Sequence, residues 1–241
     1  MQYTTIGSDL NVSKIAYGMW RFGGTSTAAA QEKIEVALEC GITLFDQADI
    51  YGVDGGGAFG DSEKLLGSVL AAQPELRTRM IIATKGGIRL GYPYDSSASY
   101  LRSAVENSLS RMGIERIDVY QIHRPDFLGD PAEIAHVLTE LRAEGKISEV
   151  GVSNYTSSQF RALQAHLPFP IVSHQPEFSA WKHSALRDGV IDQALELGLA
   201  VLAWSPLAGG NLMSSSAQGA LGNCISVLDR IALEQGADRA A

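Results

Sequence analysis

The sequence predicts an α/β fold in which parallel strands curve into a barrel, and three observations support this prediction. Short apolar runs alternate with amphipathic helical patterns along the 241-residue chain, which is typical of a parallel sheet with right-handed crossovers. Hydrophobic residues make up 45% of the chain, enough for a large core, and single α/β barrels of about 200–250 residues are common. Polar residues follow four of the apolar runs, where the carboxyl ends of barrel strands carry functional groups.

Seven segments are expected to form the strands of the parallel sheet. Each is a short run rich in apolar and β-branched residues, bounded by residues that favour turns. In chain order they are residues 15–20, 43–45, 80–84, 117–122, 149–153, 171–174 and 199–204.

Helices are expected between these strands and after the last one. Asp61, Asp130 and either Thr156 or Ser157 are typical helix N-caps, and glycine follows several of the predicted helices. The predicted helical ranges are residues 27–40, 61–72, 98–112, 131–144, 157–166, 185–197 and 226–235.

The first residues favour a different element. Residues 3–6 and 10–12 flank Gly7-Ser8-Asp9, a sequence suited to a hairpin turn, and such a hairpin would plug the bottom of a barrel. A closed barrel of this kind needs eight strands. We therefore expect a single domain, residues 1–241, with the fold of a (β/α)8 TIM barrel whose eighth strand–helix unit is absent from the chain.

Charge and composition exclude several classes of partner. The net charge of −8 and the pI of about 5.1 disfavour binding to nucleic acid or to an anionic membrane. The two cysteines, Cys40 and Cys224, are too few for a disulfide framework, and Cys40 is expected to pack as a small hydrophobe. No apolar run is long enough to span a bilayer, and the first five residues lack the features of a signal peptide. We expect a cytoplasmic protein that is a monomer or a weak homo-oligomer.

Four residues at successive strand ends form a candidate catalytic group: Asp46, Tyr51, Lys85 and His123. A tyrosine has a reference pKa near 10, and a neighbouring ammonium such as Lys85 lowers that pKa by favouring the phenolate. Asp46 is suited to hold Lys85 in place. His123 could orient a substrate carbonyl while Tyr51 donates its proton. Taken singly, each residue also has a structural interpretation as a turn cap, a solvated lysine, a packing aromatic or a core-rim histidine.

A second group of residues follows the later strands and is suited to bind a flat, phosphate-bearing cofactor. Hydroxyl and amide side chains could bind a carboxamide, an indole offers a flat apolar face, and glycine backbone permits close approach of a pyrophosphate. Helix capping and core packing are the structural alternatives. In chain order the group is Ser153, Asn154, Gln175, Trp204, Ser205, Leu207, Gly209 and Gly210.

At these positions the chain resembles the aldo-keto reductases, and within that family its bacterial oxidoreductase branch. The resemblance rests on FDQADIYG, IATKGG, QIHRPD, GVSNY and AWSPLAGG, which stand in the family's order. It implies a (β/α)8 barrel that transfers a hydride from NADPH to an aldehyde or ketone.

Several residue roles are implied by this resemblance. Asp46, Tyr51, Lys85 and His123 match the family's catalytic tetrad, with Tyr51 as the general acid. The amide-binding positions match Ser153, Asn154 and Gln175, and the stacking aromatic matches Trp204. The family continues into an eighth strand and a loop that clamps the adenosine 2′-phosphate, for which this chain has no residues after Arg239. NADPH is therefore expected from the resemblance alone, and NADH remains an alternative.

Trp20 and Tyr92 are expected to line an apolar mouth that accepts small carbonyl compounds, unless they are merely surface aromatics. Two other functions compete with the reductase. A metal-dependent barrel hydrolase would use His123, His174, Asp46 and Asp49, but the usual metal-binding pairs are missing, and we expect no metal site. A barrel that binds the cofactor without turnover is the non-catalytic alternative.

Overall fold

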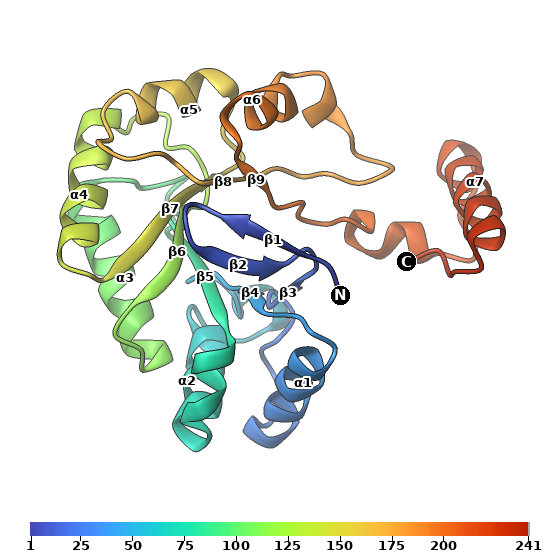
Figure 1. Cartoon of the computed structure of the whole chain (residues 1–241), viewed down its shortest axis with the longest axis horizontal. Helices are drawn as coiled ribbons and strands as arrows, with labels where there is room; N and C mark the ends of the chain where they lie inside the picture. Colours follow the sequence, from blue (N-terminus) through green and yellow to red (C-terminus); the bar gives the residue numbers. More distant parts are fainter. Residues whose placement is uncertain (241) are drawn as a thin grey trace.

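The computed structural model describes residues 1–240, and its centre is one curved parallel sheet. The strands follow the chain in the order β3-β4-β5-β6-β7-β8-β9, with helices around the outside of the curve (Figure 1). This confirms the predicted α/β fold, with seven of the strands of a (β/α)8 barrel present in the described residues. The strands are β3 Ala16–Gly18, β4 Leu44–Asp46, β5 Ile81–Gly86, β6 Ile117–Ile122, β7 Ile147–Ser153, β8 Ser173–Gln175 and β9 Ala200–Val201.

The helices agree with the predicted ranges at most positions. One predicted helix, residues 185–197, is divided into a short 3₁₀ turn, Ser184–Leu186, and α6, because Gly189 adopts a left-handed φ of 83° just before α6 begins. The last helix begins earlier than predicted. The α-helices are α1 Thr27–Glu39, α2 Asp61–Ala72, α3 Ala98–Met112, α4 Pro131–Ala143, α5 Ser157–Gln164, α6 Val190–Leu197 and α7 Gly219–Gln235.

The predicted caps hold at two helices and fail at one. Asp130 caps α4 by accepting a hydrogen bond from the backbone N–H of Ala132 at 2.8 Å, and Thr156 forms a capping box with Gln159 at the start of α5. Asp61 is the first residue of α2 rather than its N-cap. Its carboxylate instead accepts a hydrogen bond from the N–H of Ala58 at 2.6 Å and so fastens the preceding loop.

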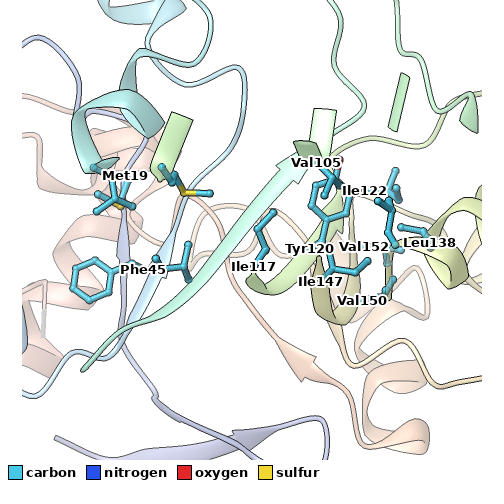
Figure 2. Close-up of a cluster of buried hydrophobic side chains, with 14 of the residues drawn as sticks. Met19, Phe45, Val105, Ile117, Tyr120, Ile122, Leu138, Ile147, Val150 and Val152 are labelled. Carbon is cyan, nitrogen blue, oxygen red and sulfur yellow. The ribbon is translucent and has the colours of Figure 1, made fainter. Parts of the chain in front are cut away.

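The main core lies between the sheet and the helices. Tyr120 and Val152 of the strands lie near Val105 of α3 and Leu138 of α4, and Phe45 belongs to the same buried cluster on the side of Met19 (Figure 2). Alternate residues of the same strands point into the barrel, which explains why the strands are apolar along both faces.

The predicted N-terminal hairpin is present and closes one end of the barrel. Strands β1, Tyr3–Ile6, and β2, Leu10–Ser13, pair antiparallel, and the hairpin lies across the middle of the curved sheet in Figure 1. Ile6 and Val12 pack against the inward-facing Leu44, Ala83 and Val119 near the amino ends of the strands. The opposite, carboxyl ends of the strands are therefore the end that is left for a functional site.

The prediction that Cys40 is buried is wrong, because both cysteines are free and Cys40 is exposed. The buried face of α1 consists of Ala30, Ile34, Ala37 and Leu38, and Cys40 falls outside that stripe as the C-cap residue. In the part of the chain that the structure describes, no helix has the length and apolar character needed to cross a membrane.

Candidate active site

The structure brings the four candidate catalytic residues together around the ammonium group of Lys85. Its Nζ donates to Asp46 Oδ2 at 2.8 Å, to the carbonyl oxygen of Gln47 at 2.7 Å and to Tyr51 Oη at 3.2 Å. The ring of His123 lies edge-on to that of Tyr51, with 6.0 Å between the ring centroids. Lys85 is wholly buried, so the structure excludes the solvated-lysine interpretation.

The strand register explains this convergence. Asp46 ends β4 opposite Ala83 of β5, and Lys85 lies opposite Gln121 of β6. Neighbouring parallel strands therefore deliver Asp46 and Lys85 to the same end of the barrel.

Two backbone hydrogen bonds hold the remaining candidates beside Lys85. His123 follows β6, and its backbone N–H donates to the carbonyl of Gly86 at 2.8 Å. The carbonyl of Tyr51 accepts a hydrogen bond from the N–H of Ser62 at 3.2 Å, which ties the loop after β4 to the first turn of α2.

Burial and charge shift the pKa values of these groups in opposing directions. Burial raises the pKa of Tyr51, the charge of Lys85 lowers it, and burial prevails, so the pKa lies above its usual value. Lys85 therefore lowers the pKa of Tyr51 as predicted, and the burial of the phenol outweighs its effect. Burial also opposes the charge on Lys85, yet Asp46 and Tyr51 together raise the pKa of Lys85.

The surroundings of His123 favour its neutral form. Burial lowers the pKa of His123 well below its usual value, and the positive charges of Lys85 and Arg124 lower it further. A neutral imidazole can donate one N–H hydrogen bond, which suits the orienting role predicted for His123 better than a role as acid.

The candidate cofactor residues form a hydrogen-bonded row at the ends of β7 and β8. Ser153 Oγ donates to the carbonyl of Gln175 at 2.8 Å, and Asn154 Nδ2 donates to Ser153 Oγ at 2.8 Å. Trp204 Nε1 donates to Asn154 Oδ1 at 2.9 Å, so the indole is fixed against this row. The row is therefore a rigid border beside the catalytic group.

The two groups form one continuous array. Gln175 Nε2 donates to Asp46 Oδ1 at 3.1 Å, while the other oxygen of Asp46 accepts from Lys85. Asn154 Nδ2 also donates to the backbone carbonyl of His123 at 3.2 Å. A ligand bound by the amide row would therefore lie next to the candidate catalytic residues Tyr51 and Lys85.

Backbone conformation singles out the same region. Within residues 1–240, three non-glycine residues have positive φ angles: Asn154 at 59°, Ser205 at 50° and Ala208 at 53°. Conformations of this kind cluster at ligand-binding sites, where the fold over-determines them. Apart from the adjacent residues, no atom of the described chain lies within 4 Å of the position that a Cβ would take on Gly209 or Gly210.

The residues present fit a nicotinamide cofactor. The open backbone after Leu207 can be approached closely, the indole of Trp204 offers a flat surface, and the amide row can bind a carboxamide. These are the features that the sequence predicted for this region.

The two residues predicted to line the mouth behave differently. Trp20 donates its indole N–H to Asp54 Oδ2 at 2.8 Å, which links the end of β3 to the loop after Tyr51. Tyr92 is 56% exposed and stacks under the guanidinium of Arg89 at 4.3 Å. Trp20 therefore contacts the loop that carries Tyr51. Tyr92 instead contacts Arg89, which lies in its own loop after β5.

Arg124 was not assigned a role from the sequence, although it stands in the quoted segment QIHRPD. Its guanidinium lies 5.6 Å from the centre of the Trp204 ring, and its charge acts on both Tyr51 and His123. The signal was its position directly after His123 at a strand end.

The metal-site alternative does not match the geometry. His174 stacks on Phe160 of α5 with 6.1 Å between the ring centroids, and burial lowers its pKa to about 4. This places His174 on the outer face of the sheet, away from Asp46. Among residues 1–240, no group of three or more His, Cys, Asp or Glu side chains could hold a metal ion.

Comparison with known proteins gives a consistent result. Residues 14–223 match a family model described as "Aldo/keto reductase family". The 6-dehydroglucose reductase of Novosphingobium aromaticivorans is 48% identical over 235 residues, which cover 96% of this chain and 77% of that protein. The 6-dehydroglucose reductase of Agrobacterium fabrum is 40% identical, and the match covers all of this chain and 82% of that protein.

A solved structure shows the same fold. The glycerol dehydrogenase of Gluconobacter oxydans superposes with a TM-score of 0.85 at 27% sequence identity, covering 98% of this chain and 80% of that one.

Proposed function

Because the chain belongs to the aldo/keto reductase family, we propose that it is an oxidoreductase that uses NADPH to reduce a small aldehyde or ketone to an alcohol, with Tyr51 as the proton donor. One observation carries the proposal. The buried ammonium of Lys85 bonds to both Asp46 and Tyr51, with His123 beside the same phenol.

The chemistry assigned to the chain's own residues follows from this geometry. Tyr51 Oη gives its proton to the carbonyl oxygen, and the ammonium of Lys85 stabilises the phenolate that results. Asp46 keeps Lys85 charged and in position. His123, being neutral, donates an N–H hydrogen bond that orients the carbonyl oxygen.

The cofactor supplies the hydride when it is bound. Ser153, Asn154 and Gln175 would hold its carboxamide, and Trp204 would lie against its flat ring. The backbone from Ser205 to Gly210 would accept the pyrophosphate. NADPH is proposed ahead of NADH on the resemblance to the family.

The substrate class is proposed from the relatives. Two curated relatives, at 48% and 40% identity, carry the name 6-dehydroglucose reductase. Among small aldehydes and ketones we therefore propose an aldehyde derived from a sugar as the substrate. The first compound to test is 6-dehydroglucose.

The test is the rate of NADPH oxidation by the purified protein with 6-dehydroglucose, simple aldehydes and, in parallel, NADH. We expect saturable turnover that is faster with NADPH and is lost in Tyr51→Phe. Quenching of tryptophan fluorescence by NADPH measures cofactor binding separately. Tight binding without turnover on any carbonyl compound would overturn the proposal and favour the non-catalytic barrel.

A further inference from the structure

Arg124 is a half-buried cation at the candidate site without an anionic partner. Among the described residues it forms no ion pair and no hydrogen bond through its guanidinium, and its contact is with the ring of Trp204 at 5.6 Å. Two other arginines that are partly buried do have a carboxylate partner: Arg111 pairs with Glu63 at 2.7 Å, and Arg77 pairs with Asp118 at 2.9 Å. A partly buried cation that lacks an acceptor is costly, so an acceptor from outside the chain would stabilise it.

The surroundings of Arg124 are fixed. The carbonyl of His123 accepts from Asn154 at 3.2 Å, and the indole of Trp204 is held by the same asparagine side chain at 2.9 Å. The guanidinium therefore rests on a rigid aromatic surface. Arg124 directly follows His123, whose ring lies beside Tyr51, and its guanidinium lies over Trp204, so it borders the candidate site. Its charge also lowers the pKa values of Tyr51 and His123.

The chemistry of a guanidinium limits what it can bind. It offers five N–H donors in a planar fork and no acceptor, and it therefore binds oxygen atoms of hydroxyl, carboxylate or phosphate groups. A hydrocarbon chain gains nothing from it.

We propose that Arg124 is a specificity-determining residue that binds oxygen atoms of the substrate next to the reacting carbonyl. The site therefore selects oxygen-rich aldehydes, carrying hydroxyl or carboxylate groups, over hydrocarbon aldehydes of the same length. The proposal rests on the proposed reductase function and adds to it the residue that would recognise an oxygen-rich substrate.

The test compares Arg124→Gln with a matched control, Arg21→Gln. Arg21 also lies over a tryptophan, 5.6 Å from the ring of Trp20, but its charge is not among those that shift the pKa values of Tyr51 and His123. The substrates are glyceraldehyde against propanal, for hydroxyl groups, and succinic semialdehyde against butanal, for a carboxylate.

The expected result is selective. Hydrogen bonds to a charged group contribute about 1.5–3 kcal/mol, so Arg124→Gln lowers kcat/KM for the oxygen-rich member of at least one pair by roughly 10- to 150-fold, mostly through KM. Propanal and butanal change by less than about threefold. The affected pair tells whether hydroxyl or carboxylate groups are bound, and Arg124→Lys should rescue a carboxylate better than hydroxyl groups.

Two outcomes would overturn the proposal. Equal losses for all four aldehydes would mean that Arg124 acts on the reaction rather than on selectivity. Weaker NADPH binding in Arg124→Gln, with unchanged selectivity, would make it a cofactor residue.

A second measurement does not depend on turnover. Binding of glycerol against 1-propanol, and of 4-hydroxybutyrate against 1-butanol, to the NADP+ complex is followed through tryptophan fluorescence. The wild-type preference for the oxygen-rich member of at least one pair should disappear in Arg124→Gln and persist in Arg21→Gln. If no aldehyde is reduced but this preference is found, the proposed function fails while the assignment of Arg124 survives. If the wild type binds both members of each pair equally well, the assignment of Arg124 as a specificity residue is wrong.

Discussion

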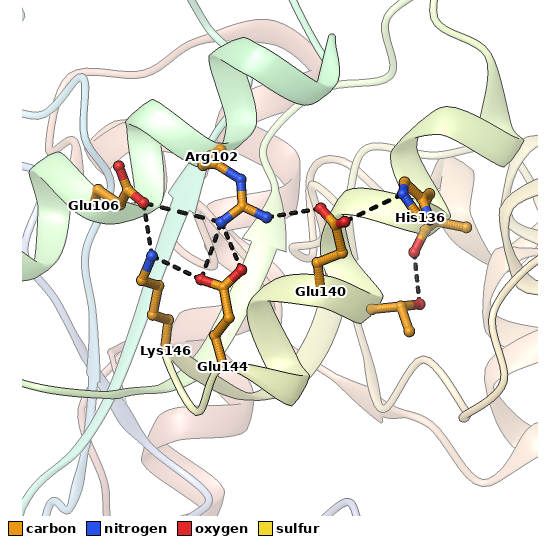
Figure 3. A network of polar contacts seen from close by, with 8 residues as sticks. Arg102, Glu106, His136, Glu140, Glu144 and Lys146 are labelled. Atoms are coloured by element: carbon orange, nitrogen blue, oxygen red, sulfur yellow. Dashed lines mark hydrogen bonds and ion pairs between the residues drawn. The ribbon is translucent and has the colours of Figure 1, made fainter.

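Two clusters of charged residues in this molecule have similar contact distances and very different surroundings. At the strand ends, Lys85 bonds to Asp46 at 2.8 Å and is wholly buried. Between α3 and α4, Arg102 bonds to Glu140 and Glu144 at 2.7 Å each, with Lys146 and Glu106 completing the surface network (Figure 3). Arg102 is 30% exposed and Glu140 46%, so water and salt screen the second cluster and not the first.

The comparison teaches that contact distance does not determine what an ion pair does. A buried ammonium acts strongly on the pKa of a neighbouring phenol, whereas a screened pair contributes little to stability. A third pair, Glu63 with Arg111, shows that a buried ion pair need not belong to the candidate site. Glu63 is wholly buried and Arg111 is 16% exposed. The other carboxylate oxygen of Glu63 accepts a hydrogen bond from the hydroxyl of Thr84 at 2.6 Å, so both oxygens of Glu63 are engaged within the fold.

The largest effect is expected from Tyr51→Phe. Removal of the phenolic proton donor should lower kcat for carbonyl reduction by about 10²- to 10⁴-fold. The Kd for NADPH, measured by fluorescence quenching, should stay nearly unchanged, because the amide row and Trp204 do not depend on the hydroxyl. Retention of wild-type kcat would remove Tyr51 from the reaction.

Lys85→Met tests how the charge of Lys85 affects the pKa of Tyr51. Lys85 lowers the pKa of Tyr51 against the larger effect of burial, so its loss should raise that pKa further. In alcohol oxidation, where Tyr51 must accept a proton, the rise of the rate with pH should move to higher pH. Lys64→Met is the matched control, because that lysine is 57% exposed on α2, and its pH profile should equal that of the wild type. An unmoved profile in an active Lys85→Met variant would contradict the assigned role.

Glu63→Leu tests whether the pair of Glu63 with Arg111 contributes to stability rather than to activity. Its partner Arg111 would keep a largely buried charge without a carboxylate, and we expect the free energy of unfolding to fall by about 3–5 kcal/mol. Urea denaturation followed by circular dichroism measures the loss. At temperatures where the variant remains folded, kcat should be close to the wild-type value, and a large drop in kcat of the folded variant would link this pair to catalysis.

The same clusters show which parts of the site could be predicted from the sequence and which could not. Asp46, Lys85 and His123 could be found because parallel strands deliver their carboxyl ends to one end of a barrel. The pairing of Glu63 with Arg111 could not be predicted, because these residues are far apart in sequence and only the packing of α2 against α3 brings their side chains together. The net direction of the Tyr51 pKa depends on how much of the phenol is buried, which no local pattern encodes. The break at Gly189 and the exposure of Cys40 were missed because both depend on backbone direction at a helix end.

The smallest effect is expected from Arg102→Ala, although this residue forms the most ion pairs of the surface network. Exposed pairs contribute about 0.2–1 kcal/mol each and are not additive, so the free energy of unfolding should fall by roughly 1 kcal/mol at low salt. The loss should shrink further at about 1 M salt, where the Debye length is near 3 Å. Glu63→Leu should lose nearly the same amount at both salt concentrations, because its pair is shielded from ions. Equal salt dependence in the two variants would mean that burial does not separate these clusters.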